Sequence, residues 1–373
     1  MGMRKHYLDN IRWITVVIVV LYHVLYMYNG VEVQGGLGKI CDLAIQPWDV
    51  FLYLVYPWMM PVLFLVAGIS SRLSLERRTD AEFIRDRTTR LLVPSTIGVL
   101  VFQFIQGYVS MSLGTGFDES SRAGVPLPIL YLIMAASGIG VLWFMQLLWL
   151  YCMALVPLKK IEKGRLLSAG EKTPVWALVV FYFVVWGAGQ ILNVPVVSVY
   201  RIGFYFVFFI LGYYVFSHDA VMERLKRMSV PLIVSAVFLS VAFSVQYFVV
   251  GGGANFADAP VNRSLLFAAS AYVGSLALLS GMARFGNAST DLTRWMTKRS
   301  LGLYIFHYLG ISTVALVLAK PGLCPAAVCY LLSLVAGFAF GYGLEPIISR
   351  IPFLRWAVLG ISRPKDRKGA HAR

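Results

Sequence analysis

Ten apolar runs of about 20 residues each constrain the fold of this chain more than any other feature of its sequence. They cover residues 11–29, 49–71, 91–113, 140–158, 174–193, 200–217, 230–250, 263–283, 300–319 and 325–349. A run of this length is what a helix needs to cross the hydrocarbon core of a bilayer, about 30 Å thick. Because no water reaches that core, each run must satisfy its own backbone hydrogen bonds as a helix. Barrel strands would be half as long and would alternate in polarity, and these runs do neither. We therefore predict an all-α, polytopic integral membrane protein with about ten transmembrane helices.

The distribution of charge predicts how these helices are oriented. The net charge is +15, although only 14% of the residues are charged, against about a quarter in soluble domains. If the N-terminus is cytoplasmic, all but five of the 33 Lys and Arg residues lie on the cytoplasmic side or at cytoplasmic helix ends. The exceptions are Lys39, Arg122, Arg201, Arg263 and Lys320. This asymmetry follows the positive-inside rule, so we expect both termini in the cytoplasm and a multi-pass protein of the cell (inner or plasma) membrane. The positive charge then reflects topology, with the lipid bilayer as a partner and no nucleic acid expected.

The connections between the runs are short, so we expect one transmembrane domain over residues 1–362 and a basic cytoplasmic tail over residues 363–373. The apolar segment 128–138 is too short to span and is expected to re-enter the bilayer or to lie at its outer surface. The first run is not expected to be a cleaved signal, because Arg12 interrupts it and no small-x-small site precedes Asn29.

The four cysteines lack metal-site spacing, so no metal is expected. A disulfide between Cys41 and Cys324 in the outer loops, and a homo-oligomer, are both left open.

Arg12 and His23 are the most informative polar residues within the runs. They are eleven residues apart, roughly three helical turns plus 20°, so both side chains share one face about 16 Å apart along the axis. Ionisable side chains at membrane depth are costly and are therefore functional candidates. His23 suits a general base that deprotonates a hydroxyl, or else a hydrogen-bonded packing residue. Arg12 suits a donor fork for an anionic group such as phosphate, or else a charge that snorkels to the interface.

Further polar residues in or beside the runs extend this set. Arg87 and Arg90 are three apart and share a helical face, so they suit the phosphates of a nucleotide-like cytoplasmic ligand or serve topology alone. Trp143 opens a run, as interfacial aromatic residues often do. His307 lies inside another run and is either a packing residue or a second catalytic or substrate-contacting group. Arg201, near the outer face, could line a polar pocket.

Several of these residues fall in motifs of a known family. Arg12 and His23 resemble the arginine, ten residues, histidine motif of membrane acyltransferase family 3, which includes O-antigen acetylases and glucan-succinylating proteins. The other matches, in chain order, are Phe64-Leu-Val-Ala-Gly68-Ile-Ser-Ser, Arg87-Thr-Thr-Arg90, Leu142-Trp143-Phe144 and Ser300-Leu-Gly302-Leu-Tyr304-Ile-Phe-His307. Together with Tyr7-Leu-Asp-Asn-Ile before Arg12, they cover nearly the whole chain. No extra extracytoplasmic hydrolase-like domain is expected here, and the chain looks most similar to the glucan-modifying branch.

The resemblance implies an integral membrane O-acyltransferase. The acyl group would pass from cytoplasmic acyl-CoA, either acetyl-CoA or succinyl-CoA, to a hydroxyl of an extracytoplasmic carbohydrate. His23 is implied as the general base or the acyl-accepting residue, and Arg12 as its motif partner. Tyr304 and His307 are implied to complete the catalytic site. Candidate donors for the oxyanion are Tyr304 and Asn29.

The remaining site residues are assigned to the two substrates. Arg87 and Arg90 are implied to contact the phosphates of acyl-CoA, the co-substrate. Asn29, Arg201 and Trp143 are expected to contact the carbohydrate acceptor. A transporter of a sugar or organic anion, which would use the same intramembrane polar residues, is the alternative. A non-catalytic scaffold is disfavoured by the two intramembrane histidines.

Overall fold

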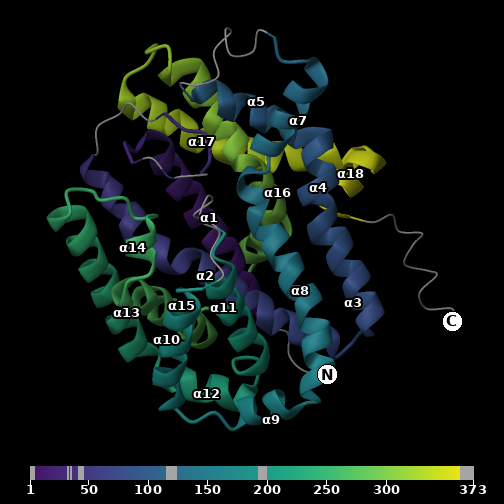
Figure 1. Cartoon of the computed structure of the whole chain (residues 1–373), viewed down its shortest axis with the longest axis vertical. Helices are drawn as coiled ribbons and strands as arrows, with labels where there is room; N and C mark the ends of the chain where they lie inside the picture. Colours follow the sequence, from purple (N-terminus) through teal and green to yellow (C-terminus); the bar gives the residue numbers. More distant parts are fainter. Residues whose placement is uncertain are drawn as a thin grey trace.

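The computed structural model describes residues 5–31, 33, 36–40, 46–114, 124–191 and 200–361, and every element of regular secondary structure in these ranges is a helix. Eight helices in this part of the chain are long and apolar enough to cross a membrane (Figure 1). They are α1 (His6–Tyr28), η1 with α2 (Pro47–Leu75), α3 to α5 (Asp80–Leu113), η4 with α8 (Gly140–Glu162), α13 with η5 (Ser229–Val250), α15 (Leu265–Phe285), α16 with η6 (Asp291–Ala319) and α17 (Ala326–Arg350). The predicted all-α polytopic fold is confirmed.

Shorter helices explain why the number of full-length spans is below the ten predicted. α11 (Ile202–Tyr214) and α12 (Asp219–Arg227) form a pair bent by 108°, which counts as a ninth span if the two are taken together. The run 174–193 forms α10 (Ala177–Ala188), whose 12 residues cover only about 18 Å. The segment 128–138 forms α7 (Leu127–Ser137), which is too short to span, as predicted. The remaining short helices are α9 (Arg165–Glu171), α14 (Ala259–Asn262) and α18 (Pro352–Leu359). The expected basic tail and Cys41 lie outside the described residues.

Polar contacts join the segments that the sequence places on the cytoplasmic side. Lys5, before α1, lies 2.7 Å from Asp219 at the start of α12. Lys159, near the end of α8, forms an ion pair with Asp80 at the start of α3. Figure 1 shows α9 and α12 at one end of the molecule and α5 and α7 at the other. These two ion pairs therefore join segments that are predicted to lie on the same side of the membrane.

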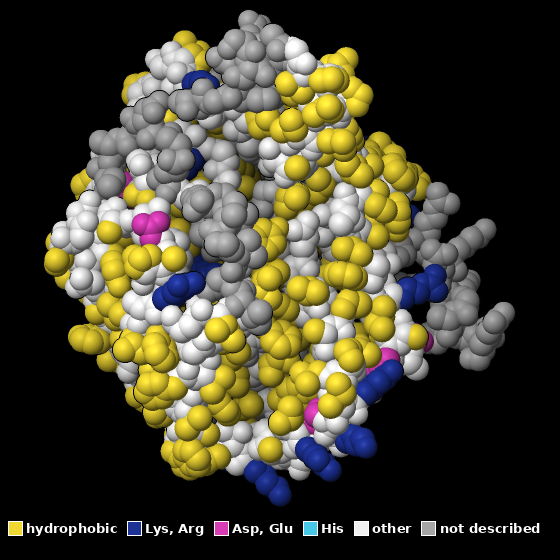
Figure 2. All heavy atoms as spheres, in the orientation of Figure 1, with side chains coloured by type: hydrophobic (Ala, Val, Ile, Leu, Met, Phe, Trp, Pro, Cys, Tyr) yellow, Lys and Arg dark blue, Asp and Glu magenta, His cyan; other side chains and the backbone are white. Residues whose placement is uncertain are grey.

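The outer surface of the bundle is largely apolar, as contact with lipid requires. Figure 2 shows hydrophobic side chains over most of the visible lateral surface, with Lys and Arg gathered along its lower right edge. α13 and η5 provide a clear example, because Phe238 is 71% exposed and Val250 is 72% exposed. Such side chains would be unfavourable in water and are stable against acyl chains.

Two glycines allow α2 and α11 to pack in direct backbone contact. A Cβ atom at Gly68 on α2 would overlap the carbonyl oxygen of Phe209, and one at Gly212 on α11 would overlap the carbonyl oxygen of Leu65. Small residues at helix interfaces permit this close approach in membranes, where dispersion contacts contribute much of the packing energy. The glycine in the Phe-Leu-Val-Ala-Gly68-Ile-Ser-Ser motif is therefore explained in this chain by the close packing of α2 on α11.

We expect Gly68→Ala to destabilise the protein by about 1–3 kcal/mol, because the added methyl group must push two helix backbones apart. The measurement is the thermal unfolding midpoint and the monodisperse yield in detergent. Gly343→Ala on α17 is the matched control, since a Cβ atom there meets no heavy atom within 4 Å. Equal stability of the two variants would show that the α2–α11 contact can relax.

Candidate functional site

Two histidines from distant parts of the chain meet inside the helix bundle. His23 lies on α1 and His307 on α16, 284 positions later, with 2.9 Å between His23 Nδ1 and His307 Nε2. His307 is fully buried, whereas His23 is only partly buried. The structure therefore brings together two residues that the sequence analysis assigned to catalysis, and His23 is the accessible member of the pair.

The hydrogen bonds of His307 assign the tautomer of both rings. His307 Nδ1 lies 2.9 Å from the carbonyl oxygens of both Leu303 and Tyr304. A carbonyl oxygen only accepts, so Nδ1 of His307 carries a proton and its Nε2 carries a lone pair when the ring is neutral. Nδ1 of His23 must then donate to that lone pair. In the neutral pair, His23 Nε2 is consequently left unprotonated and able to accept a proton from another molecule.

Aromatic rings fix the position of the His23 imidazole. The rings of Tyr22, Tyr26 and Tyr308 stand edge-on to it, with centroids 5.2, 6.1 and 5.1 Å away. Edge-to-face contacts at these separations are favourable and restrict ring rotation. Tyr308 Oη in turn donates to the carbonyl of Gly38 at 2.8 Å. The imidazole is therefore held between α1 and α16 in one orientation.

Tyr304 and Trp143 belong to one aromatic cluster, but their polar groups have different surroundings. Tyr304 Oη donates to the backbone carbonyl of Val141 in η4, so this hydroxyl anchors the start of α8. The backbone carbonyl of Tyr304 is the group that faces His307. The Trp143 ring lies 5.6 Å from Tyr205 and is only partly buried. Tyr304 thus acts on the histidine pair through its main chain in this structure.

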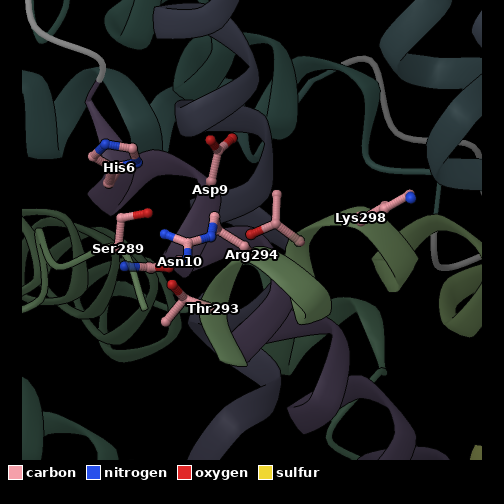
Figure 3. A pocket seen from close by; sticks show the side chains of 8 residues that line it. His6, Asp9, Asn10, Ser289, Thr293, Arg294 and Lys298 are labelled. Carbon is pink, nitrogen blue, oxygen red and sulfur yellow. The ribbon is translucent and has the colours of Figure 1, made fainter. Parts of the chain in front are cut away.

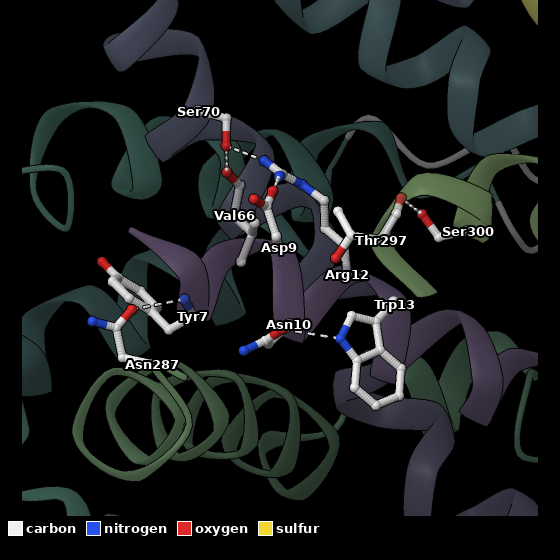
Figure 4. A network of polar contacts seen from close by, with 10 residues as sticks. All are labelled: Tyr7, Asp9, Asn10, Arg12, Trp13, Val66, Ser70, Asn287, Thr297 and Ser300. Carbon is white, nitrogen blue, oxygen red and sulfur yellow. Dashed lines mark hydrogen bonds and ion pairs between the residues drawn. The ribbon is translucent and has the colours of Figure 1, made fainter. Parts of the chain in front are cut away.

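Arg12 is part of a polar network near the N-terminal end of α1 (Figure 4). Its Nη1 donates to Asp9 Oδ1 at 2.7 Å, and its Nη2 donates to Ser70 Oγ on α2. Ser70 Oγ donates to the carbonyl of Val66 at 2.8 Å. The Arg12 side chain is 38% exposed. It is therefore held by α2 at the end of α1 opposite to His23, while part of it faces open space.

A pocket of about 320 Å³ opens beside this network, between the first turns of α1 and the start of α16 (Figure 3). α16 begins here because Thr290 caps it: Thr290 Oγ1 accepts from the Thr293 backbone N–H at 3.2 Å, and the Thr293 hydroxyl oxygen accepts from the Thr290 backbone N–H at 2.9 Å. The pocket is lined by His6, Asp9, Asn10, Ser289, Thr293, Arg294, Thr297 and Lys298. Two cations and a histidine face one lining carboxylate, although Arg294 also pairs with Asp291 at the start of α16. This excess of positive charge makes the pocket suited to an anionic ligand.

The sequence analysis missed the pocket residues Arg294 and Lys298. Both lie in a segment where Lys and Arg are expected from topology alone, so their spacing carried no separate signal. Only the packing of α1 on α16 brings them into one pocket with Asp9 and Asn10.

Arg87 and Arg90 lie elsewhere, between α3 and α4, and do not line this pocket. α3 ends at Arg87 and is followed by the π-helix η2 (Thr88–Leu92), a distortion that is frequent at functional sites. Arg90 Nε lies 3.0 Å from Asp86 Oδ1, and Arg78 holds the other oxygen of the same carboxylate at 3.1 Å. The Arg87 guanidinium lies 5.0 Å from the centre of the Phe83 ring, and its buried Nε has no hydrogen-bond partner among the described residues. Of the two arginines, Arg87 is therefore the one with an unused buried hydrogen-bond donor among the described residues.

Asn29 and Arg201 both lie toward the outer half of the bundle. Asn29 is buried, donates to Asp49 Oδ2 at 2.8 Å and accepts from the backbone N–H of Val31 at 2.7 Å. Its amide therefore holds the end of α1 against the start of α2. Arg201 immediately precedes α11 and donates from Nη2 to Tyr56 Oη at 2.8 Å. Within the described ranges, no group of three His, Cys, Asp or Glu side chains could hold a metal ion.

Comparison with known proteins gives one informative match. Residues 5–345 match a family model described as an acyltransferase domain, of family 3. The matched range contains every candidate site residue considered above. No curated protein and no solved structure shows significant similarity to the chain.

Proposed function

Since the chain belongs to membrane acyltransferase family 3, we propose that it moves an acyl group of the acetyl or succinyl class from cytoplasmic acyl-CoA to a hydroxyl of an extracytoplasmic carbohydrate. The protein is an acyltransferase with multiple membrane-spanning helices. We further propose that it acts in the cell membrane. The observation that carries the proposal is the His23–His307 pair, because it leaves one imidazole nitrogen with a free lone pair at membrane depth.

His23 is the general base of the proposed reaction. Its Nε2 takes the proton of the acceptor hydroxyl as the oxygen attacks the thioester carbonyl carbon. When the tetrahedral intermediate collapses, the carbon–sulfur bond breaks and the CoA thiolate leaves with the proton that His23 had accepted. His307 accepts the hydrogen bond from His23 Nδ1 throughout and so keeps the basic nitrogen directed at the substrate. The same lone pair could instead attack the thioester and form an acyl-histidine before transfer.

The oxyanion donors must come from groups with a free proton. The Tyr304 hydroxyl is bonded to Val141 and the Asn29 amide to Asp49, so both candidates from the sequence hold other partners in this structure. Either group would have to exchange its partner on substrate binding to serve the reaction. Trp143, Asn29 and Arg201 remain our proposed contacts to the acceptor, with the part-exposed Trp143 ring suited to the apolar face of a sugar.

The donor would enter from the cytoplasmic side, because a polyphosphate cannot cross hydrocarbon. The pocket near Arg12 supports this route. It is basic, and the first turns of α1, the helix that carries His23, form one of its sides. Arg12 and His23 are separated by about 16 Å along α1, a distance that the slender pantetheine arm can bridge. Arg87 and Arg90 are the second proposed docking position for the phosphates.

We expect the double substitution Arg294→Ala with Lys298→Ala to raise the KM for acyl-CoA by about tenfold or more while kcat changes little. Each charged hydrogen bond to a phosphate contributes about 1.5–3 kcal/mol to binding. Steady-state kinetics at two ionic strengths provide the measurement, because the lost contacts should also weaken the salt dependence. Arg87→Ala with Arg90→Ala is the matched comparison. An unchanged KM for the first pair, with a raised KM for the second, would move the docking site to α3.

The experiment that tests the proposed function is mass spectrometry of envelope glycans from cells with and without the protein. An added acyl mass that depends on the protein supports the proposal and identifies acyl group and acceptor together. Glycans of unchanged mass, with the protein expressed and folded, would argue against a carbohydrate acceptor.

A further inference from the structure

Arg201 is a charged residue placed at membrane depth, in the same layer of the bundle as His23. It immediately precedes α11, whose 13 residues extend about 20 Å toward the cytoplasmic end at Tyr214. His23 lies about 26 Å along α1 from its first residue, His6. Both side chains therefore fall in the outer half of a hydrocarbon layer of about 30 Å.

The Arg201 side chain is enclosed by aromatic rings and is only 5% exposed. Its guanidinium carbon lies 4.8 to 5.6 Å from the centres of four rings, those of Phe267, Tyr56, Tyr205 and Phe204. Cation–π contacts of this kind stabilise a guanidinium, but they leave N–H groups without acceptors. Among the described residues, only Nη2 has a hydrogen-bond partner, the hydroxyl of Tyr56.

Two nitrogens of this buried cation have no partner in the described ranges. Arg201 Nε and Nη1 are inaccessible to solvent and make no hydrogen bond among the described residues. No carboxylate in that part of the chain lies within salt-bridge distance of the guanidinium either. Burying a charge without a counter-ion is unfavourable, and such sites are therefore expected to receive an anion.

The guanidinium is connected to the histidine pair through two tyrosine rings. Tyr56, which contacts Arg201, stacks on Tyr22 with 6.3 Å between centroids. The Tyr22 ring lies 5.2 Å from the His23 ring. Arg201 and His23 therefore belong to one continuous cluster of side chains inside the bundle.

We propose that Arg201 binds a carboxylate of the substrate while the acyl group is transferred at His23. This inference rests on the proposed function and deepens it by naming a chemical group of the substrate. The single positive charge of a guanidinium matches the single charge of a carboxylate, for which its planar donors are well suited. The carboxylate has two sources: the far end of a dicarboxylic acyl group, or an acidic sugar of the acceptor.

Binding measurements on the purified full-length protein in detergent test the proposal with two pairs of probes. Succinyl-CoA is compared with butyryl-CoA, which has the same chain length without the carboxylate, and glucuronic acid is compared with glucose. In one of the two pairs, we expect the carboxylate probe to bind at least about tenfold more tightly to the wild type. Arg201→Met, which keeps an apolar side chain for the aromatic rings, should remove that preference by weakening the binding of the carboxylate probe much more than that of the neutral probe.

Two further variants complete the design. Arg263→Met, at an exposed arginine before α15, is the matched control and should keep the preference. If Arg201→Met does not fold, Arg201→Lys keeps the charge but loses the planar donors and should lower the preference several-fold. The inference is overturned if the wild type shows no preference in either pair, or if the preference survives substitution of Arg201. Failure of both CoA thioesters to bind the wild type would instead contradict the proposed donor, whatever the sugar pair shows.

Discussion

Replacement of His23 by alanine is expected to lower the rate of acyl transfer by about 10²- to 10⁴-fold, the usual contribution of a positioned general base. Alanine leaves His307 without its neighbour and leaves no nitrogen to accept the proton of the attacking hydroxyl. The same substitution also prevents an acyl-histidine, so the loss is expected for either route. The measurement is the initial rate of transfer from acyl-CoA at equal amounts of folded protein.

His218→Ala is the matched control for this experiment. His218 immediately precedes α12 among the basic segments and makes no contact with the histidine pair. The control is expected to retain the wild-type rate. A His23→Ala variant that is folded and equally active would remove this imidazole from the mechanism.

The second large effect is expected at His307, which acts by positioning His23. His307→Leu removes the acceptor for His23 Nδ1–H, so the imidazole can rotate or adopt the other tautomer. By comparison with other bases that lose their orienting partner, we expect the rate to fall by about 10²- to 10⁴-fold. His307→Gln offers an amide oxygen to the same N–H and should be roughly five- to tenfold faster than the leucine variant, since a neutral hydrogen bond contributes about 1–1.5 kcal/mol.

The comparison of the two variants separates positioning from packing. Leucine and glutamine fill similar volumes in this fully buried site, so a purely structural role would not favour glutamine. Rates for the two variants are compared at equal thermal stability and at several pH values. A glutamine variant no faster than the leucine variant would contradict the assigned tautomer.

Most of the fold was predictable because membrane spans are encoded by length and hydropathy along a single dimension. The runs at 11–29 and 263–283, for example, correspond closely to α1 and α15. The run 200–217 does not form one straight span, because α11 ends at Tyr214 and the chain turns by 108° into α12. A bend of this kind depends on tertiary packing and has no signature in average hydropathy.

The candidate site was only partly predictable for a similar reason. The family motifs identified His23 and His307, but their direct contact joins positions 284 residues apart and required the packing of α1 on α16. The unprotonated Nε2 of His23 followed only from the carbonyls that face His307. Arg294 was indistinguishable in sequence from an ordinary topological charge, although it lines the pocket between α1 and α16.

The central claim is that one imidazole on α1 meets a thioester that arrives from the cytoplasm. It is tested most directly by a structure of the protein bound to a non-reactive ketone analogue of acyl-CoA. The quantity to measure is the distance between the analogue's carbonyl carbon and His23 Nε2. The account predicts about 3–6 Å, which leaves room for direct attack or for one hydroxyl. A ligand bound with its acyl end outside the α1–α16 interface, or a His23 ring turned toward lipid, would contradict it.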